Sequence, residues 1–180
     1  WCENTSNTEA FALGLQEAGA QLVTVHGRTR KQGFSGRADW EAIAKIKKSL
    51  DIPVIANGDI KNSRDAIECL EITNADGVMI GRASMGAPWL VGQIDEEINN
   101  QKTFIEPDAK MKISLSLEHL KLLVSKKGNH GLLIARKHMN WTCRGFQGSS
   151  ALRHKLVRAG TPNDAINLLE EELMKLKQKN

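Results

Sequence analysis

Three short apolar segments alternate with helical patterns in the first hundred residues. The segments lie at 21–30, 52–60 and 76–83, and each is a run of Val, Ile, Leu or Met that ends in a polar or glycine-containing turn. Runs of this kind are typical of parallel strands that are buried on both faces of a sheet. Between the runs, apolar residues recur three or four positions apart, which predicts helices. The alternation therefore indicates right-handed βαβ units and a parallel sheet.

Capping residues mark where these helices begin and end. Asp39 is suited to cap the helix that follows the first strand, and Ser63 is suited to cap the next one. An earlier helix is expected over residues 7–18, with Gly19 at its end. These positions give each predicted strand a helical neighbour of ordinary length.

Three such strands fit the last part of a TIM (β/α)₈ barrel. A complete barrel needs eight strands and roughly 250 residues, so we expect an α/β fold with about the last three βα units at residues 1–100. The chain begins with Trp1-Cys2 and not with Met, which we interpret as a truncated protein that lacks the first five strands. The alternative is a small open α/β domain, whose apolar sheet would then expose an edge.

Charge divides the chain into two parts. Residues 1–107 contain 11 Lys and Arg against 15 Asp and Glu, and residues 108–180 contain 14 against 6. The first part therefore carries −4 and the second +8, which agrees with the +4 of the chain. The polar stretch 101–107, which ends in Pro107, is the expected linker.

The carboxyl-terminal part is expected to be a small all-α domain at residues 108–180. It has no strand pattern, and glycines and one proline separate four helical stretches. These stretches are residues 108–126, 132–144, 150–159 and 163–177. Between Met111 and Gly160 the only acid is Glu118, which favours a polyanionic partner, most simply nucleic acid, over a merely solvated basic face. No apolar run reaches transmembrane length, so no membrane partner is expected.

The cysteines give no chemical signature. Cys2, Cys69 and Cys143 are scattered without CxxC spacing, so no metal site is expected. Reduced thiols and a cytoplasmic protein are the default expectation. Cys69 lies in a helical pattern and is interpreted as a core residue, whereas basic neighbours should lower the pKa of Cys143. No base accompanies Cys143, so no catalytic residue is assigned.

Polar residues at the strand ends form the candidate site. Asn57-Gly58-Asp59 follows the second strand and Gly81-Arg82 the third. The last two βα turns of a barrel often hold a phosphate through backbone N–H groups. Glycine lets the main chain approach the phosphate, Arg82 offers a guanidinium group for its oxygens, and Asn57 and Asp59 suit ribityl or ribose hydroxyls. The alternative is that both glycines only make tight turns.

His26 ends the first strand and is expected to point into the mouth of the barrel. The loop that follows, 27–37, contains glycines, one aromatic residue and several cations, including Arg28 and Arg30. Loops of this length on a barrel rim are usually functional. Its cations would meet a large anionic substrate.

Together these motifs resemble the tRNA-dihydrouridine synthases, most closely the bacterial B-type subfamily. The shared stretches occur in the family's order over nearly the whole chain: HGRTR, GFSGRADW, PVIANGDI, ADGVMIGRASMGAPW and IARKHMNW. PVIANGDI alone has counterparts in other flavin barrels, but the combination does not. The resemblance implies an FMN-binding barrel followed by a helical tRNA-binding domain. NADPH would reduce the FMN, and a hydride from the flavin would then reduce the C5–C6 bond of particular uridines, each flipped out of the RNA.

The resemblance also implies roles for single residues. FMN would be bound by His26, Asn57, Gly58, Asp59, Gly81 and Arg82. The residues expected to face RNA are Arg28, Arg30, Arg136, Lys137, His138, Arg144 and Arg153. The family's proton-donating cysteine would lie in the missing half, so the chain alone is expected to be inactive. Two alternatives stay open: an FMN barrel that acts on a small molecule, such as a dihydroorotate-type dehydrogenase, and a non-catalytic RNA-binding remnant.

Overall fold

The computed structural model describes residues 7–100 and 105–178. Its backbone contacts divide the chain into two compact units, here called the sheet unit and the helical unit. The sheet unit comprises Trp1–Ser84 and Trp89–Phe104, and the helical unit comprises Met85–Pro88 and Ile105–Asn180. The predictions for Trp1-Cys2 and for linker residues 101–104 lie outside the described residues.

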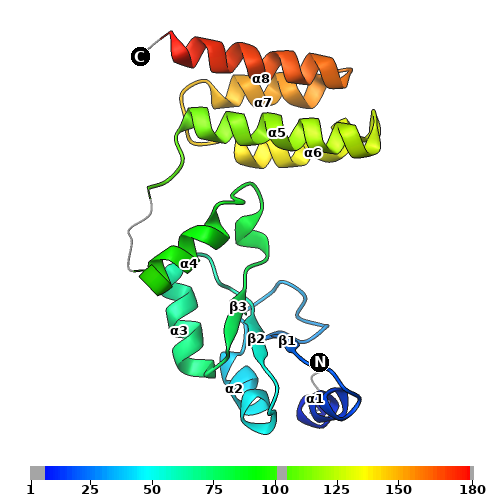
Figure 1. The fold of residues 1–180 in the computed structure, drawn as a ribbon, viewed down its shortest axis with the longest axis vertical. Helices are drawn as coiled ribbons and strands as arrows, with labels where there is room; N and C mark the ends of the chain where they lie inside the picture. The colour runs from blue at the N-terminus through cyan, green and yellow to red at the C-terminus, as the bar shows by residue number, and fades with distance from the viewer. Residues whose placement is uncertain (1–6, 101–104, 179–180) are drawn as a thin grey trace. The chain divides into compact units, whose positions relative to one another are not determined.

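The sheet unit contains a parallel sheet in the order β1-β2-β3. The strands are β1 (Val23–His26), β2 (Val54–Asn57) and β3 (Gly77–Met79). The helices are α1 (Thr8–Glu17), α2 (Trp40–Ser49), α3 (Ser63–Thr73) and α4 (Leu90–Asn100), with a short 3₁₀ turn, η1, at Arg82–Ser84. In chain order α1 packs on α2, α2 on α3 and α3 on α4 (Figure 1). The predicted α/β class and parallel sheet are thereby confirmed.

The sheet is buried on one face only. Val25, Val54 and Ala56 lie in the core that the helices cover. Thr24 and His26, which alternate with Val25 along β1, are exposed. The expectation of burial on both faces is therefore wrong for this chain, because side chains alternate along a strand and the helices of the sheet unit cover a single face.

The helix starts follow the predicted capping chemistry with one correction. Asp39 caps α2, where its carboxylate accepts a hydrogen bond from the Ala42 N–H at 2.9 Å. The cap of α3 is Asn62 and not Ser63, and its side-chain oxygen accepts from the Asp65 N–H at 2.9 Å. The capping residue must be extended, and Asn62 is, with φ at −155°, whereas Ser63 is already the first helical residue.

The helical unit is built from four helices that lie alongside one another (Figure 1). They are α5 (Ala109–Lys127), α6 (His130–Thr142), α7 (Ser149–Arg158) and α8 (Pro162–Lys177). Both α5 and α7 pack against α6 and α8. Close approach of α5 and α6 depends on Gly131, since a Cβ there would lie 2.5 Å from the Leu123 carbonyl oxygen. Within the described residues, none of the helices combines the length and apolarity that crossing a membrane requires.

Candidate functional site

The register of the sheet brings the predicted strand-end residues to one edge. His26 of β1 lies opposite Asn57 of β2, and Asn57 lies opposite Met79 of β3. The Gly27 N–H then donates to the Asn57 carbonyl oxygen at 2.9 Å, which continues the pairing past the strand end. Ligands of parallel α/β sheets bind at this carboxyl edge.

The turn after β2 has a left-handed backbone. Gly58 has φ at +129°, and a Cβ there would lie 2.7 Å from the Ala38 Cβ. The next residue, Asp59, has φ at +61°, a conformation that few residues other than glycine adopt. The backbone therefore turns sharply beneath the loop that follows β1, and only glycine fits at position 58.

Arg28 anchors that loop from inside. Only 2% of its side chain is exposed, and its Nη2 donates to both carboxylate oxygens of Asp59, at 2.6 and 2.7 Å. The same Nη2 also donates to the Gly36 carbonyl, and Nε donates to the Ser35 carbonyl. The guanidinium group thus joins both ends of the loop to the turn after β2. This corrects the expectation of a surface role, because a side chain buried in this way has no face to offer to RNA.

Asp59 is held by the loop on both of its oxygens. Oδ2 also accepts the Ala38 N–H at 2.7 Å, in addition to the Arg28 contact. Burial alone would raise the pKa of Asp59, but the hydrogen bonds from Arg28 and Ala38 outweigh it and bring the pKa below its usual value. The carboxylate of Asp59 thus holds the loop in place, while 23% of its side chain stays exposed, and its expected role toward ribityl hydroxyls stays a prediction.

Arg82 remains available at the edge of the site. Half of its side chain is exposed, and its Nη2 lies 3.5 Å from Asp59 Oδ1. Its guanidinium group lies 4.8 Å from the centre of the Phe34 ring, which belongs to the loop that Arg28 anchors. No heavy atom comes within 4 Å of a Cβ placed on Gly81. This arrangement leaves a fixed cation beside open space.

His26 is an exposed side chain at the same edge. Partial desolvation and the nearby Arg28 lower the pKa of His26, which outweighs the opposite effect of Asp59. The imidazole is therefore neutral near neutral pH, with one nitrogen to donate and one to accept a hydrogen bond.

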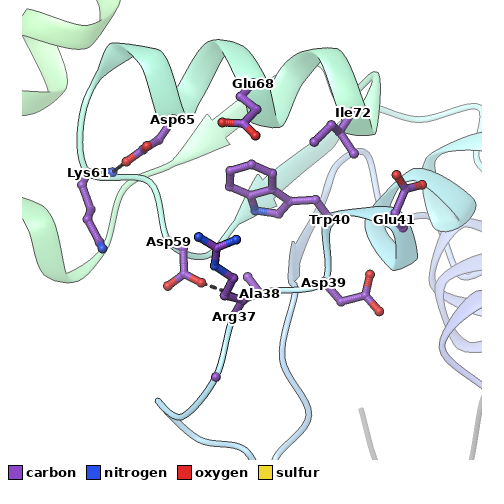
Figure 2. Close-up of a pocket in the computed structure, with 11 residues that line it drawn as sticks. Arg37, Ala38, Asp39, Trp40, Glu41, Asp59, Lys61, Asp65, Glu68 and Ile72 are labelled. Carbon is purple, nitrogen blue, oxygen red and sulfur yellow. Dashed lines mark hydrogen bonds between the residues drawn. The ribbon is translucent and has the colours of Figure 1, made fainter.

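A pocket of about 490 Å³ has Asp59 in its lining (Figure 2). Trp40 lies in its wall, and its Nε1 donates to the Gly58 carbonyl oxygen at 3.1 Å. Arg37, Lys61 and Glu68 line it with mixed charge. Asp59 is the single predicted site residue in this lining, so the pocket borders the strand-end site without containing it.

The basic residues of the helical unit fall into two groups. Lys137 and Arg144 are exposed, as a contact with RNA requires, and Nε of Arg144 also donates to the Asn140 carbonyl at 2.9 Å. Arg136 and Arg153 are half-buried and bind main-chain carbonyls: Arg136 donates to Ala159 at 2.9 Å and Arg153 to Cys143 at 2.9 Å. These two arginines therefore satisfy carbonyls beyond the ends of α7 and α6, a role that the sequence prediction missed. In the sheet unit Arg30 is exposed, in contrast to Arg28.

His138 belongs to an aromatic cluster that the sequence analysis also missed. Its ring meets the His119 ring edge-on at 4.9 Å and the Trp141 ring at 5.5 Å. Lys137 Nζ lies 5.9 Å from the centre of the Trp141 ring. The position of Trp141, three residues after His138 on a helix, was the signal available in the sequence.

The two cysteines of the described chain are buried. Burial raises the pKa of the Cys69 thiol to about 11. Burial also raises the pKa of Cys143, whose sulfur lies 3.4 Å from Ser116 Oγ. The expectation that basic neighbours lower the pKa of Cys143 is wrong, because desolvation outweighs the charge of Arg153. Both thiols are protonated at neutral pH.

Comparison with known proteins gives one family. The family described as dihydrouridine synthase (Dus) matches residues 1–178. A probable tRNA-dihydrouridine synthase 1 from Synechocystis is 46% identical over 173 residues, which cover 96% of this chain and 49% of the relative. A probable tRNA-dihydrouridine synthase from Rickettsia bellii is 44% identical over 154 residues, covering 85% of this chain and 47% of the relative.

A B-type relative matches over a similar range. The tRNA-dihydrouridine synthase B of Pasteurella multocida is 36% identical over 171 residues, covering 94% of this chain and 52% of the relative. The chain thus spans about half the length of the curated relatives that it matches.

Proposed function

We propose, since this chain belongs to the dihydrouridine synthase family, that the whole protein reduces uridines in tRNA to 5,6-dihydrouridine. The observation that carries the proposal is the meeting of His26, Asn57 and Arg82 at one edge of a parallel sheet, in a chain with tRNA-dihydrouridine synthase relatives. NADPH is the proposed reductant. The reaction adds a hydride to C6 of the uracil ring and a proton to C5.

We further propose that the sheet unit is part of a TIM barrel. Helices cover one face of its sheet, and the opposite face carries the exposed side chains of Thr24 and His26. In a closed barrel the helices lie outside and this second face points into the barrel. The proposal therefore accounts for the one-sided burial.

The strand-end residues fit the phosphate-bearing cofactor FMN. The left-handed turn at Gly58 leaves no room for a Cβ, while the space beside Gly81 is open. Arg28 Nη1 is buried without a hydrogen-bond partner in the protein, and it lies 3.8 Å from where a Cβ on Gly58 would stand. An unpaired donor beside a glycine turn suits a ligand that carries acceptor oxygens.

Each residue of this site has a distinct proposed role. Arg82 pairs with the phosphate, and its charge and planar donors suit phosphate oxygens. His26 and Asn57 offer neutral donors and acceptors to the remaining polar atoms of the cofactor. Arg28 and Asp59 hold the loop and the turn that shape the site. Bound FMN, once reduced by NADPH, would supply the hydride for the uracil ring.

The proton for C5 is proposed to come from a residue other than Cys69 and Cys143. Both thiols are buried and have raised pKa values, and neither lies at the strand ends. Such thiols are poor proton donors to a substrate because the substrate has no access to them.

The activity itself is tested with the whole protein and unmodified tRNA. Incubation with FMN and NADPH should produce dihydrouridine, measured by mass spectrometry of the digested nucleosides. NADPH oxidation without dihydrouridine, but with turnover of a small unsaturated substrate, would contradict the proposal and favour a small-molecule oxidoreductase.

Arg82→Ala should lower the affinity for FMN by about ten- to a hundredfold. A hydrogen bond to a charged group typically contributes about 1.5–3 kcal/mol, which corresponds to that range. The affinity is measured by titrating the flavin-free whole protein with FMN and following flavin fluorescence. Arg64→Ala, at an exposed position on α3, is the matched control and should leave the affinity unchanged.

Riboflavin separates the phosphate contact from general damage to the site. Because riboflavin lacks the phosphate, Arg82→Ala should affect its binding much less than that of FMN. Equal losses for both ligands, or equal FMN affinity in the variant and wild type, would show that Arg82 does not bind the phosphate.

A further inference from the structure

A compact aromatic and cationic cluster joins α5 and α6 in the helical unit. It consists of His119 on α5 and of Lys137, His138 and Trp141 on α6, and is called here the histidine cluster. The two imidazoles lie 4.9 Å apart, and Lys137 reaches over the neighbouring indole. His119 and Lys137 are exposed, so part of the cluster is accessible to a ligand.

Among the described residues, the charged groups that shift the pKa of His138 are both basic. His119 approaches it from α5, and Lys137 is its neighbour on α6. The nearest acid in the sequence is Glu118, the only one between residues 111 and 160. Burial, followed by the charges of His119 and Lys137, lowers the pKa of His138. If both imidazoles were protonated, two positive charges would lie next to each other and close to the positive charge of Lys137. A nearby anion would relieve that repulsion.

We propose that His119 and His138 together bind a phosphate group of tRNA, so that RNA binding and protonation of the imidazole pair favour each other. This inference rests on the proposed function, because it takes tRNA as the partner of the helical unit. It adds to that function a phosphate-binding site made of two imidazoles. Lys137 supplies a permanent charge, and the two histidines supply charge only when they are protonated.

The proposal fixes the direction of the pH effect. An anion stabilises protonated His138, so the pKa of His138 is higher in the complex than in the free protein. Binding then takes up protons, and the affinity rises as the pH falls through the interval between the bound and free values. Each pKa unit of difference corresponds to about a tenfold change in affinity.

The experiment measures tRNA affinity of the whole protein from about pH 8 to about pH 5.5 at constant ionic strength. Wild type should bind about tenfold more tightly at the lower pH, as a shift of one pKa unit requires. His138→Gln should remove most of this change and leave the affinity at the higher pH within about twofold of wild type. His154→Gln, which changes an exposed histidine on α7, is the matched control and should keep the full pH dependence.

His119→Gln provides an independent test at an exposed position, where the fold has little to lose. It should also flatten the pH dependence, while circular dichroism of each variant reports the intact helices. Wild-type pH dependence in both His119→Gln and His138→Gln would overturn the proposal. Absence of tRNA binding at every pH would instead contradict tRNA as the partner, and this inference with it.

Discussion

Arg28→Met should destabilise the loop between β1 and α2 by about 2–4 kcal/mol. Removing one partner of a buried ion pair typically costs about 3–5 kcal/mol, because the other charge is left without compensation. Asp59 retains 23% exposure of its side chain, so water relieves part of this cost. The methionine keeps the apolar length of arginine and removes only the guanidinium group, which isolates the polar contacts.

Hydrogen exchange in the whole protein measures this effect locally. The Ala38 amide, which donates to Asp59, should exchange about 30- to 1000-fold faster in Arg28→Met, which is the same free energy expressed as a rate. Arg30→Met changes an exposed cation of the same loop, and the stability of the loop should stay within about 0.5 kcal/mol of wild type. Wild-type exchange in Arg28→Met would show that the loop does not depend on this pair.

A double variant tests the cause of the destabilisation. Arg28→Met combined with Asp59→Asn removes both charges, keeps a side-chain oxygen for the Ala38 N–H and suits the left-handed backbone at position 59, so it should be less destabilised than Arg28→Met alone. The contribution of the Arg28–Asp59 ion pair to stability should also fall in acid. The folded-state pKa of Asp59 lies below its usual value, so its contribution is complete above that usual value and disappears as the pH falls through the lowered one.

The fold was largely predictable because its signals are local. The three strands coincide with the apolar runs, and the Asp39 cap follows from one side chain and the amide three residues later. The Ser63 cap was misplaced by one residue, since Asn62 and Ser63 are both good caps and only the backbone distinguishes them. That the sheet is covered on a single face depends on packing over the whole unit, which no short window contains.

The site was predictable in position and less so in chemistry. The sequence places His26, Asn57 and Arg82 at strand ends, and the register of the sheet brings these ends to one edge. It does not distinguish Arg28 from Arg30, because burial of Arg28 depends on Asp59, 31 residues further along the chain. The roles of Arg136 and Arg153 were missed for the same reason: their carbonyl partners lie in other segments of the helical unit.

The affinity of the whole protein for tRNA should fall steeply with salt. Contacts between cations and about four to six phosphates release counterions and give a log–log slope of roughly −3 to −5. A rise from 50 to 200 mM salt would then weaken binding by roughly 60- to 1000-fold, as that slope requires. We expect this salt dependence because basic residues are in excess in the helical unit, where Glu118 is the only acid between residues 111 and 160.

Single variants assign this slope to particular side chains. Lys137→Ala and Arg144→Ala remove exposed cations, and each should flatten the slope by about one. Lys175→Ala is the matched control, since Lys175 is exposed but pairs with Glu172 at 3.0 Å on α8. Arg136→Ala and Arg153→Ala should chiefly lower stability, because both arginines bind main-chain carbonyls within the unit. If affinity is independent of salt, or if Lys175→Ala flattens the slope as much as Lys137→Ala, Lys137 and Arg144 do not form the RNA contact.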